Sequence, residues 1–270
     1  MPVQSKAAWS EFLDEVERIR KKLGFKHAEE CFYRGHSNAS YLLLPGLYRG
    51  VKKHVKRISD ELWYNESDLF YEFRSKATSL HKQQVSDWDI LFFMQHHGVR
   101  TRLLDWTDSL GVAVYFALLN CNPASGSPCI WIMNPYRFNE VFHHTRDLWD
   151  PQLLNFYKNY NKEGNSYSEF MLYENNGKII PWDKPVALYP LRKAERLSTQ
   201  SGYFTIHGND SRPIETIVGK RQGLLYRVHI PKNAISGAVS FLESAGINQF
   251  SLFPDLDGLS KYLNKKYFLT

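Results

Sequence analysis

The chain has 270 residues and a formal net charge of +6 at pH 7, with 43% hydrophobic and 23% charged residues. This composition is typical of a globular protein with a large core and excludes a disordered chain. The mild positive charge is compatible with a phosphate-bearing partner and does not by itself establish one.

Membrane and secretory classes are also disfavoured. No apolar run approaches the roughly 20 residues of a membrane span, and the first residues, MPVQSKAAW, lack the apolar core of a signal peptide. Cys31, Cys121 and Cys129 form an odd count without metal-ligand spacing, which suits core thiols in a reducing compartment. We therefore expect a cytoplasmic protein with no membrane partner.

The predicted elements begin with an amphipathic helix over residues 5–23, which Gly24 ends. A buried strand is expected over 30–36, with Arg34 at its end and Gly35 letting the backbone bend. An arginine in this position is suited to gripping a phosphate or carboxylate through a bidentate fork. The alternative for Arg34 is an internal salt bridge to an acid such as Asp105.

A basic run and a helical insertion follow. Residues 48–57, YRGVKKHVKR, are typical of a solvated face or loop, and the alternative is contact with phosphate. Residues 60–97 are predicted to be helical in two pieces, with Ser86 capping the second. His96 and His97 close that helix. Adjacent helical residues point about 100° apart, so at most one of them faces a given site, and His97 is our candidate.

The densest chemistry lies between Gln95 and Leu118, where histidines, arginines, aspartates and threonines precede an apolar run. We interpret this stretch as a polar loop held at both ends, the usual setting of binding and catalytic groups. The alternative is a buried polar network. Further strands are expected at 127–135, 185–190 and 223–231, and a helix at 232–246.

An irregular segment at about 136–180 and a second polar cluster at 196–207 complete the pattern. It predicts an α+β fold with a mixed, partly antiparallel sheet, an N-terminal helix and the 60–97 insertion, in one domain over 1–270. Glycine-rich phosphate loops, a nucleophile elbow and zinc-spaced cysteines are absent from the sequence. Ordinary ATPases, α/β-hydrolases, Rossmann enzymes and zinc enzymes are therefore disfavoured.

Four motifs make the chain resemble the FRG domain family across nearly its whole length. They are Phe32-Tyr33-Arg34-Gly35, Gln95 to Ala117 with its D-W-T core, Arg196 to Phe204, and Phe253 to Gly258. Arg100 departs from the pattern, because the family usually has proline there. The resemblance implies a protein of bacteria or phages, of the kind found in conflict systems.

A second resemblance, to ADP-ribosyltransferases, rests on the order of Arg34, Thr107 with Tyr115-Phe116-Ala117 on a second strand, and Gln200. It implies that NAD is the substrate and that Arg34 holds its pyrophosphate or ribose. Tyr33 or Trp106 would stack on the nicotinamide. Asp105 would orient Arg34 or stabilise the oxocarbenium ion, because Gln200 cannot act as a base.

The expected catalytic set is therefore Arg34, Asp105 and Gln200, with no metal. The remaining candidates are expected to bind substrate: Tyr33, Gly35, His97, Thr101, Arg102, Trp106, Thr107 and Arg196. The expected ligand is an anionic nucleotide, and a nucleic acid or a protein could be the acceptor.

Two alternatives stay open. In a non-catalytic domain, Arg34, Arg102 and Arg196 would form a basic pocket for nucleotide or nucleic-acid phosphate. In a nuclease-like hydrolase, Asp105, Asp255 and Asp257 would hold magnesium, although the last two are also ordinary turn formers.

Overall fold

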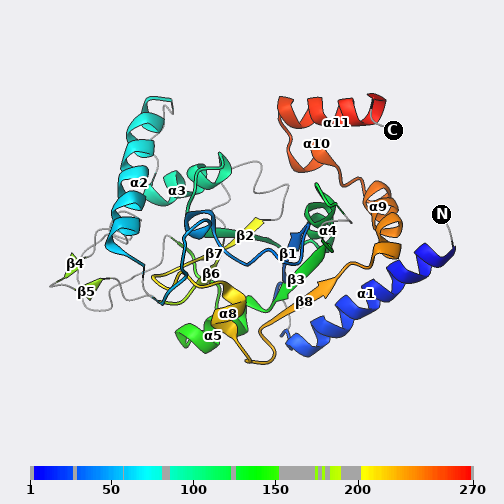
Figure 1. Cartoon of the computed structure of the whole chain (residues 1–270), viewed down its shortest axis with the longest axis horizontal. Coiled ribbons are helices and arrows are strands. Elements are labelled where there is room, and N and C mark those ends of the chain that lie inside the picture. Colours follow the sequence, from blue (N-terminus) through cyan, green and yellow to red (C-terminus); the bar gives the residue numbers. More distant parts are fainter. Residues whose placement is uncertain are drawn as a thin grey trace.

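The computed structural model of the chain (Figure 1) describes residues 3–26, 29–56, 58–80, 86–122, 126–151, 174–175, 178–179, 183–189 and 202–268. Its main feature is a six-stranded sheet in the order β6-β7-β2-β1-β3-β8. The strands are β1 (Phe32–His36), β2 (Leu103–Thr107), β3 (Cys129–Met133), β6 (Val186–Leu188), β7 (Gly202–Ile206) and β8 (Leu225–His229). A separate hairpin pairs β4 (Glu174–Asn175) with β5 (Lys178–Ile179).

The helices surround this sheet. They are α1 (Val3–Leu23), α2 (Asp60–Leu80), α3 (Asp87–His96), α4 (Leu110–Leu118), α5 (Pro135–His143), α8 (Ile214–Val218), α9 (Ile235–Ser244), α10 (Gln249–Leu252) and α11 (Leu256–Phe268). The α+β class and the helices expected over 5–23 and 60–97 are confirmed. Ser86 caps α3 in a capping box with Asp89, as a serine at that position can. None of the helices in the described ranges has the length and apolar character that crossing a membrane requires.

Every pairing between strands of the main sheet is antiparallel, so the sheet is not mixed as predicted. A single parallel bridge joins Trp149 to Leu188 beside it. The expectation of a mixed sheet came from strands and helices that alternate irregularly along the chain. That order does not determine strand direction when long connections intervene.

Apolar clusters cover both faces of the sheet. Helices α1, α4 and α9 pack on β1, β3 and β8, and α2 and α3 pack on β2, β6 and β7. Because Leu103 and Leu104 are neighbours on β2 but belong to different clusters, the cluster beneath α3 and the one beneath α5 and α8 lie on opposite faces. Phe32 and Tyr33 are likewise neighbours on β1 and belong to different clusters, so the cluster that contains α4 also lies opposite the one beneath α5 and α8. Helices α3 and α4 therefore lie on the same face of the sheet. Figure 1 shows α3 and α4 on either side of the β2–β1 junction.

Two local predictions in this region were wrong. The stretch that we interpreted as a polar loop contains strand β2, because Leu103, Leu104 and Trp106 bury apolar side chains on the two faces of the sheet. The segment from Tyr115 to Ala117 belongs to helix α4, not to the strand that the second resemblance implied. The side chain of Ser109 accepts a hydrogen bond from the Val112 amide and so starts that helix.

Helix α4 crosses β1 at Gly35. A Cβ atom on Gly35 would lie 1.9 Å from the carbonyl oxygen of Ala113 and 2.6 Å from the amide nitrogen of Ala117. Only a residue without a side chain allows the helix backbone to approach the strand this closely. The glycine therefore has a packing role that accounts for its place after Arg34.

Candidate functional site

A cavity of about 830 Å³ opens where β1 and β2 meet, beside α3 and α4. Its volume lies within the range of small-molecule binding sites. The walls come from both strands, both helices, the segment after β1, two residues of β7 and one residue of the C-terminal region. Its polar and charged lining includes Arg34, His36, Ser37, Ser40, Arg49, His54, Gln95, His96, Asp105 and Thr107.

Arg34 and Asp105 meet across a break in the sheet. Strands β1 and β2 pair at one position, Tyr33 opposite Thr107, whereas β1 pairs with β3 over five positions. Where the pairing has ended, Nη1 of Arg34 donates to the carbonyl oxygen of Asp105 at 2.5 Å. The same nitrogen lies 3.6 Å from the Asp105 carboxylate, so the ion pair considered as the alternative for Arg34 is present.

The carboxylate of Asp105 is held from its other side by Gln95. The Leu103 amide donates to Oγ1 of Thr101 at 3.0 Å, and the Thr101 hydroxyl donates to Oε1 of Gln95 at 2.6 Å. This orientation turns Nε2 of Gln95 toward Asp105, where it contacts both carboxylate oxygens at 3.0 and 2.9 Å. The side chain of Asp105 is still 54% exposed, so its carboxylate is held in place and accessible from the cavity.

Burial and the neighbouring Arg34 together keep His36 neutral. Its Nε donates to Nε2 of His36 at 3.2 Å, which requires that nitrogen to carry a lone pair. Burial, reinforced by the charge of Arg34, lowers the pKa of His36 to about 3. Burial also lowers the pKa of Arg34, while Asp105 opposes that shift and nearby Arg49 adds to it. His36 is therefore a neutral support for a charged arginine.

The basic run supplies a second arginine to the cavity. Arg49 lines it and donates through Nε to the Leu44 carbonyl at 3.1 Å; Gly50 and His54 line it too. With Arg34 and Arg49 against one acid among the described lining residues, the cavity carries a net positive charge. This arrangement favours an anionic ligand.

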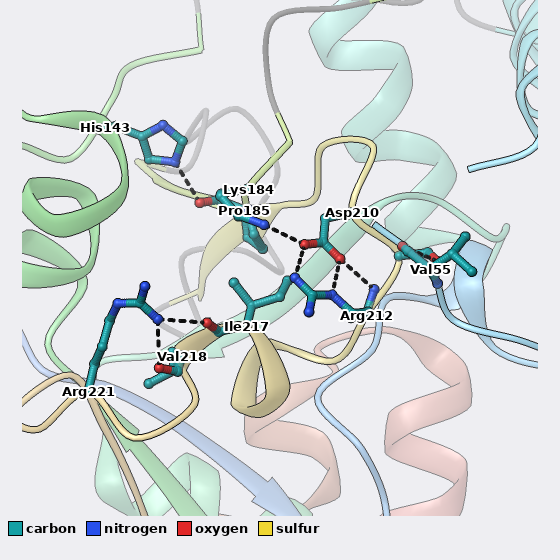
Figure 2. Close-up of polar contacts among 10 residues, drawn as sticks. Val55, His143, Lys184, Pro185, Asp210, Arg212, Ile217, Val218 and Arg221 are labelled. Atoms are coloured by element: carbon teal, nitrogen blue, oxygen red, sulfur yellow. Dashed lines mark hydrogen bonds and ion pairs between the residues drawn. The ribbon is translucent and has the colours of Figure 1, made fainter. Parts of the chain in front are cut away.

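The end of this basic segment is hydrogen-bonded to Ser211, the residue after the buried acid Asp210. The Val55 amide donates to Oγ of Ser211 at 3.0 Å, and the Ser211 amide donates to the Val55 carbonyl at 2.9 Å. Next to Ser211, the carboxylate of Asp210 accepts hydrogen bonds from Lys184 and Arg212, as Figure 2 shows. Burial alone would raise the pKa of Asp210, but these bonds lower it. The ionised Asp210 therefore stabilises the turn that anchors the cavity wall.

Several predicted site residues come together at the cavity. Arg34, Gly35, Asp105 and Thr107 line it, and Gly35 does so while packing against α4. Tyr33 and Trp106 also border it, but their side chains are 2% and 3% exposed and belong to the core clusters. Neither aromatic ring therefore offers an open stacking face of the kind that the nicotinamide role requires. Arg196 and Gln200 lie outside the described residues.

Other predicted residues lie away from the cavity. His97 is exposed and does not line it, whereas its neighbour His96 does. Thr101 is buried, and its hydroxyl orients the side chain of Gln95. Arg102 is fully buried: Nε donates to Oε1 of Glu66 at 2.6 Å, and Nη1 donates to the His207 carbonyl at 3.1 Å. The proposed ligand role of Arg102 is therefore corrected to a buried ion pair, because its donors face protein acceptors.

The nuclease-like alternative receives no geometric support. Asp255 accepts a hydrogen bond from the Gly258 amide at 2.7 Å at the start of α11, which is the turn role considered for it. Neither Asp255 nor Asp257 is among the residues that line the cavity with Asp105. Within the described ranges, no three His, Cys, Asp or Glu side chains are grouped so that they could hold a metal ion.

Comparison with protein families matches residues 29–125 to the FRG domain. The chain contains an FRG domain. The match covers less than half of the chain and includes β1, α2, α3, β2 and α4. No curated protein and no solved structure matches the chain.

Most residues that line the cavity belong to the FRG domain, and the residues of its first motif have different roles. In the first motif Tyr33 packs into the core, Arg34 faces the cavity and Gly35 admits α4. Residues beyond the match, Gly202, Phe204 and Phe253, complete the wall. The cavity is therefore assembled by the FRG domain together with strand β7 and the residue that follows α10.

The lining residues that sequence reasoning missed include Tyr41, Arg49, His54, Gln95 and His96. For Arg49 and His54 the signal was the basic run, which we assigned to solvent. For Gln95 the signal was its place at a helix end next to the polar stretch. Nothing in the sequence alone distinguished His96 from His97.

Proposed function

We propose that the cavity binds a phosphate-bearing nucleotide and that the substrate is NAD. Arg34 and Arg49 supply the positive charge that a pyrophosphate requires, and a guanidinium can bind phosphate oxygens through two parallel hydrogen bonds. Asp105 would have to share Arg34 with the ligand. Nε of Arg34 already donates to His36 and Nη1 to the Asp105 carbonyl, so a bound phosphate would have to share these donors or use Nη2.

The observation that carries the proposal is the carboxylate of Asp105, which Gln95 orients beside Arg34 in one accessible cavity. Cleavage of NAD breaks the bond between the ribose and the nicotinamide nitrogen, and the electron pair leaves with nicotinamide. Positive charge then develops on the ribose, where a fixed carboxylate stabilises it. Water or an acceptor hydroxyl attacks the ribose and releases a proton. With water, the products are ADP-ribose, nicotinamide and a proton.

Binding without cleavage is the second candidate. Among the described residues that line the cavity, Asp105 is the one acid, so no second carboxylate is available there to activate an acceptor. A non-catalytic FRG domain would use the same two arginines for phosphate and keep Asp105 as a partner of Arg34. The role in conflict between bacteria and phages that the resemblance implies would follow from NAD loss in the first case and from nucleotide sensing in the second.

The test is release of nicotinamide from NAD, followed by chromatography. The wild-type protein is compared with Asp105→Asn and with Asp108→Asn, an exposed acid just after β2 that does not line the cavity. We expect turnover by the wild type and Asp108→Asn, and a loss of at least roughly 100-fold in Asp105→Asn. Binding of NAD without turnover by any of the three would favour the second candidate, and no binding would refute both.

A further inference from the structure

We propose that Tyr41 and Leu42 form the platform on which the base of the bound nucleotide stacks. Both side chains line the cavity, yet they are 55% and 46% exposed. Exposed apolar side chains at the wall of a cavity are a common mark of a ligand surface. The inference rests on the nucleotide binding proposed above and adds to it the subsite for the base.

The segment that presents these side chains is fastened on both sides. Before it, the Ala39 amide donates to the Ser127 carbonyl at 2.8 Å, and Nη1 of Arg227 donates to the Ala39 carbonyl at 2.9 Å. After it, Leu43 is fully buried, and its amide donates to the Glu215 carboxylate at 3.2 Å. The backbone that carries Tyr41 and Leu42 is therefore anchored on both sides, at Ala39 and at Leu43.

The platform is connected to the phosphate-binding arginine by one side chain. The rings of Tyr41 and His36 have centroids 6.3 Å apart at an angle of 65°, and His36 accepts a hydrogen bond from Arg34. A nucleotide has the same order of groups, with its phosphate and its base joined through the ribose. A tyrosine ring stacks on any nucleobase, because every base has a π face. The geometry thus pairs a charged subsite with an adjoining flat, apolar one.

The experiment is calorimetric titration with two probes, ADP and inorganic pyrophosphate. The proteins are the wild type, Tyr41→Ala, Tyr41→Phe and, as the matched control, Tyr64→Ala. Tyr64 is 57% exposed on α2 and does not line the cavity. We expect Tyr41→Ala to weaken ADP binding about tenfold, in line with the loss of one base–aromatic stack, and to leave pyrophosphate binding unchanged. Tyr41→Phe and Tyr64→Ala should bind both probes as the wild type does.

Two results would overturn the platform alone. They are ADP affinity in Tyr41→Ala within twofold of the wild type, or an equal loss of ADP and pyrophosphate affinity. In both cases the wild type still binds pyrophosphate, so the phosphate site proposed above would stand. A wild-type protein that binds neither probe would overturn the platform and the proposed function together.

Discussion

The substitution Gly35→Ala tests the packing that positions the cavity. The new methyl carbon would lie 1.9 Å from the Ala113 carbonyl oxygen and 2.6 Å from the Ala117 amide nitrogen, well inside ordinary contact distances. Both atoms belong to the helix backbone, so no side-chain rotation relieves the clash, and α4 must move by more than an ångström. Overpacking a core usually costs about 1–3 kcal/mol, and a backbone clash belongs at the upper end.

We therefore expect Gly35→Ala to lower the free energy of unfolding by about 3 kcal/mol or more. For a chain of this size, that corresponds to a fall in Tm of roughly 6–12 °C. The measurement is thermal unfolding followed by circular dichroism. Gly46→Ala is the matched control, because the nearest atom to its added Cβ is 3.4 Å away, and its Tm should stay within about 2 °C of the wild type. An unchanged Tm in Gly35→Ala would refute the packing role.

Three further predictions concern the buried network and the oriented carboxylate. Arg102→Ala should lower the free energy of unfolding by about 3–5 kcal/mol, because Glu66 loses its buried guanidinium, while ADP affinity of the folded protein stays unchanged in calorimetry. Burial lowers the pKa of both His36 and His207 to about 3. The unfolded chain therefore binds more protons below about pH 6.5, and stability should fall with acid by about 1.4 kcal/mol per pH unit and histidine. Gln95→Ala should reduce NAD turnover roughly 10- to 100-fold, with a smaller change in NAD affinity, because the cavity carboxylate loses its orienting donor.

Each of these predictions has an outcome that contradicts it. Urea unfolding of Arg102→Ala at wild-type stability would deny the structural role of that arginine. Equal stability at pH 7.5 and 5.5 would show that the two histidines are not neutral in the fold. For Gln95, a variant with unchanged kcat, or one whose whole effect is on binding, would remove the positioning role.

The sequence predicted helices better than strands. Long periodic segments such as 5–23 carry their structure in their spacing, and α1 and α2 begin and end close to where that spacing indicated. Strand β2 was missed because its apolar residues face opposite sides, Asp105 interrupts them and Thr107 follows them. Its place between β1 and β7 depends on pairings with residues about 70 and 100 positions away. Periodicity within one segment cannot report such pairings.

The candidate site was predictable in its residue types and less so in its geometry. Arg34 and Asp105 were identified from their chemistry, and they share the cavity. Arg102 could not be separated from Arg34 on this basis, because its partner Glu66 lies 36 positions away on helix α2. Arg49 was assigned to solvent for the same reason. Its place in the cavity wall depends on hydrogen bonds from the neighbouring segment to distant residues, namely Thr101, Gly208 and Ser211.

Nucleotide binding at Arg34 is best tested by the affinity for ADP of the wild type, Arg34→Ala and Arg100→Ala, measured by calorimetry at one salt concentration. Arg100 is the matched control, because it is exposed and does not line the cavity. We expect Arg34→Ala to lose roughly 10- to 100-fold in affinity with its fold intact, and Arg100→Ala to bind like the wild type. Equal affinity of all three proteins, or no binding by the wild type, would contradict this expectation.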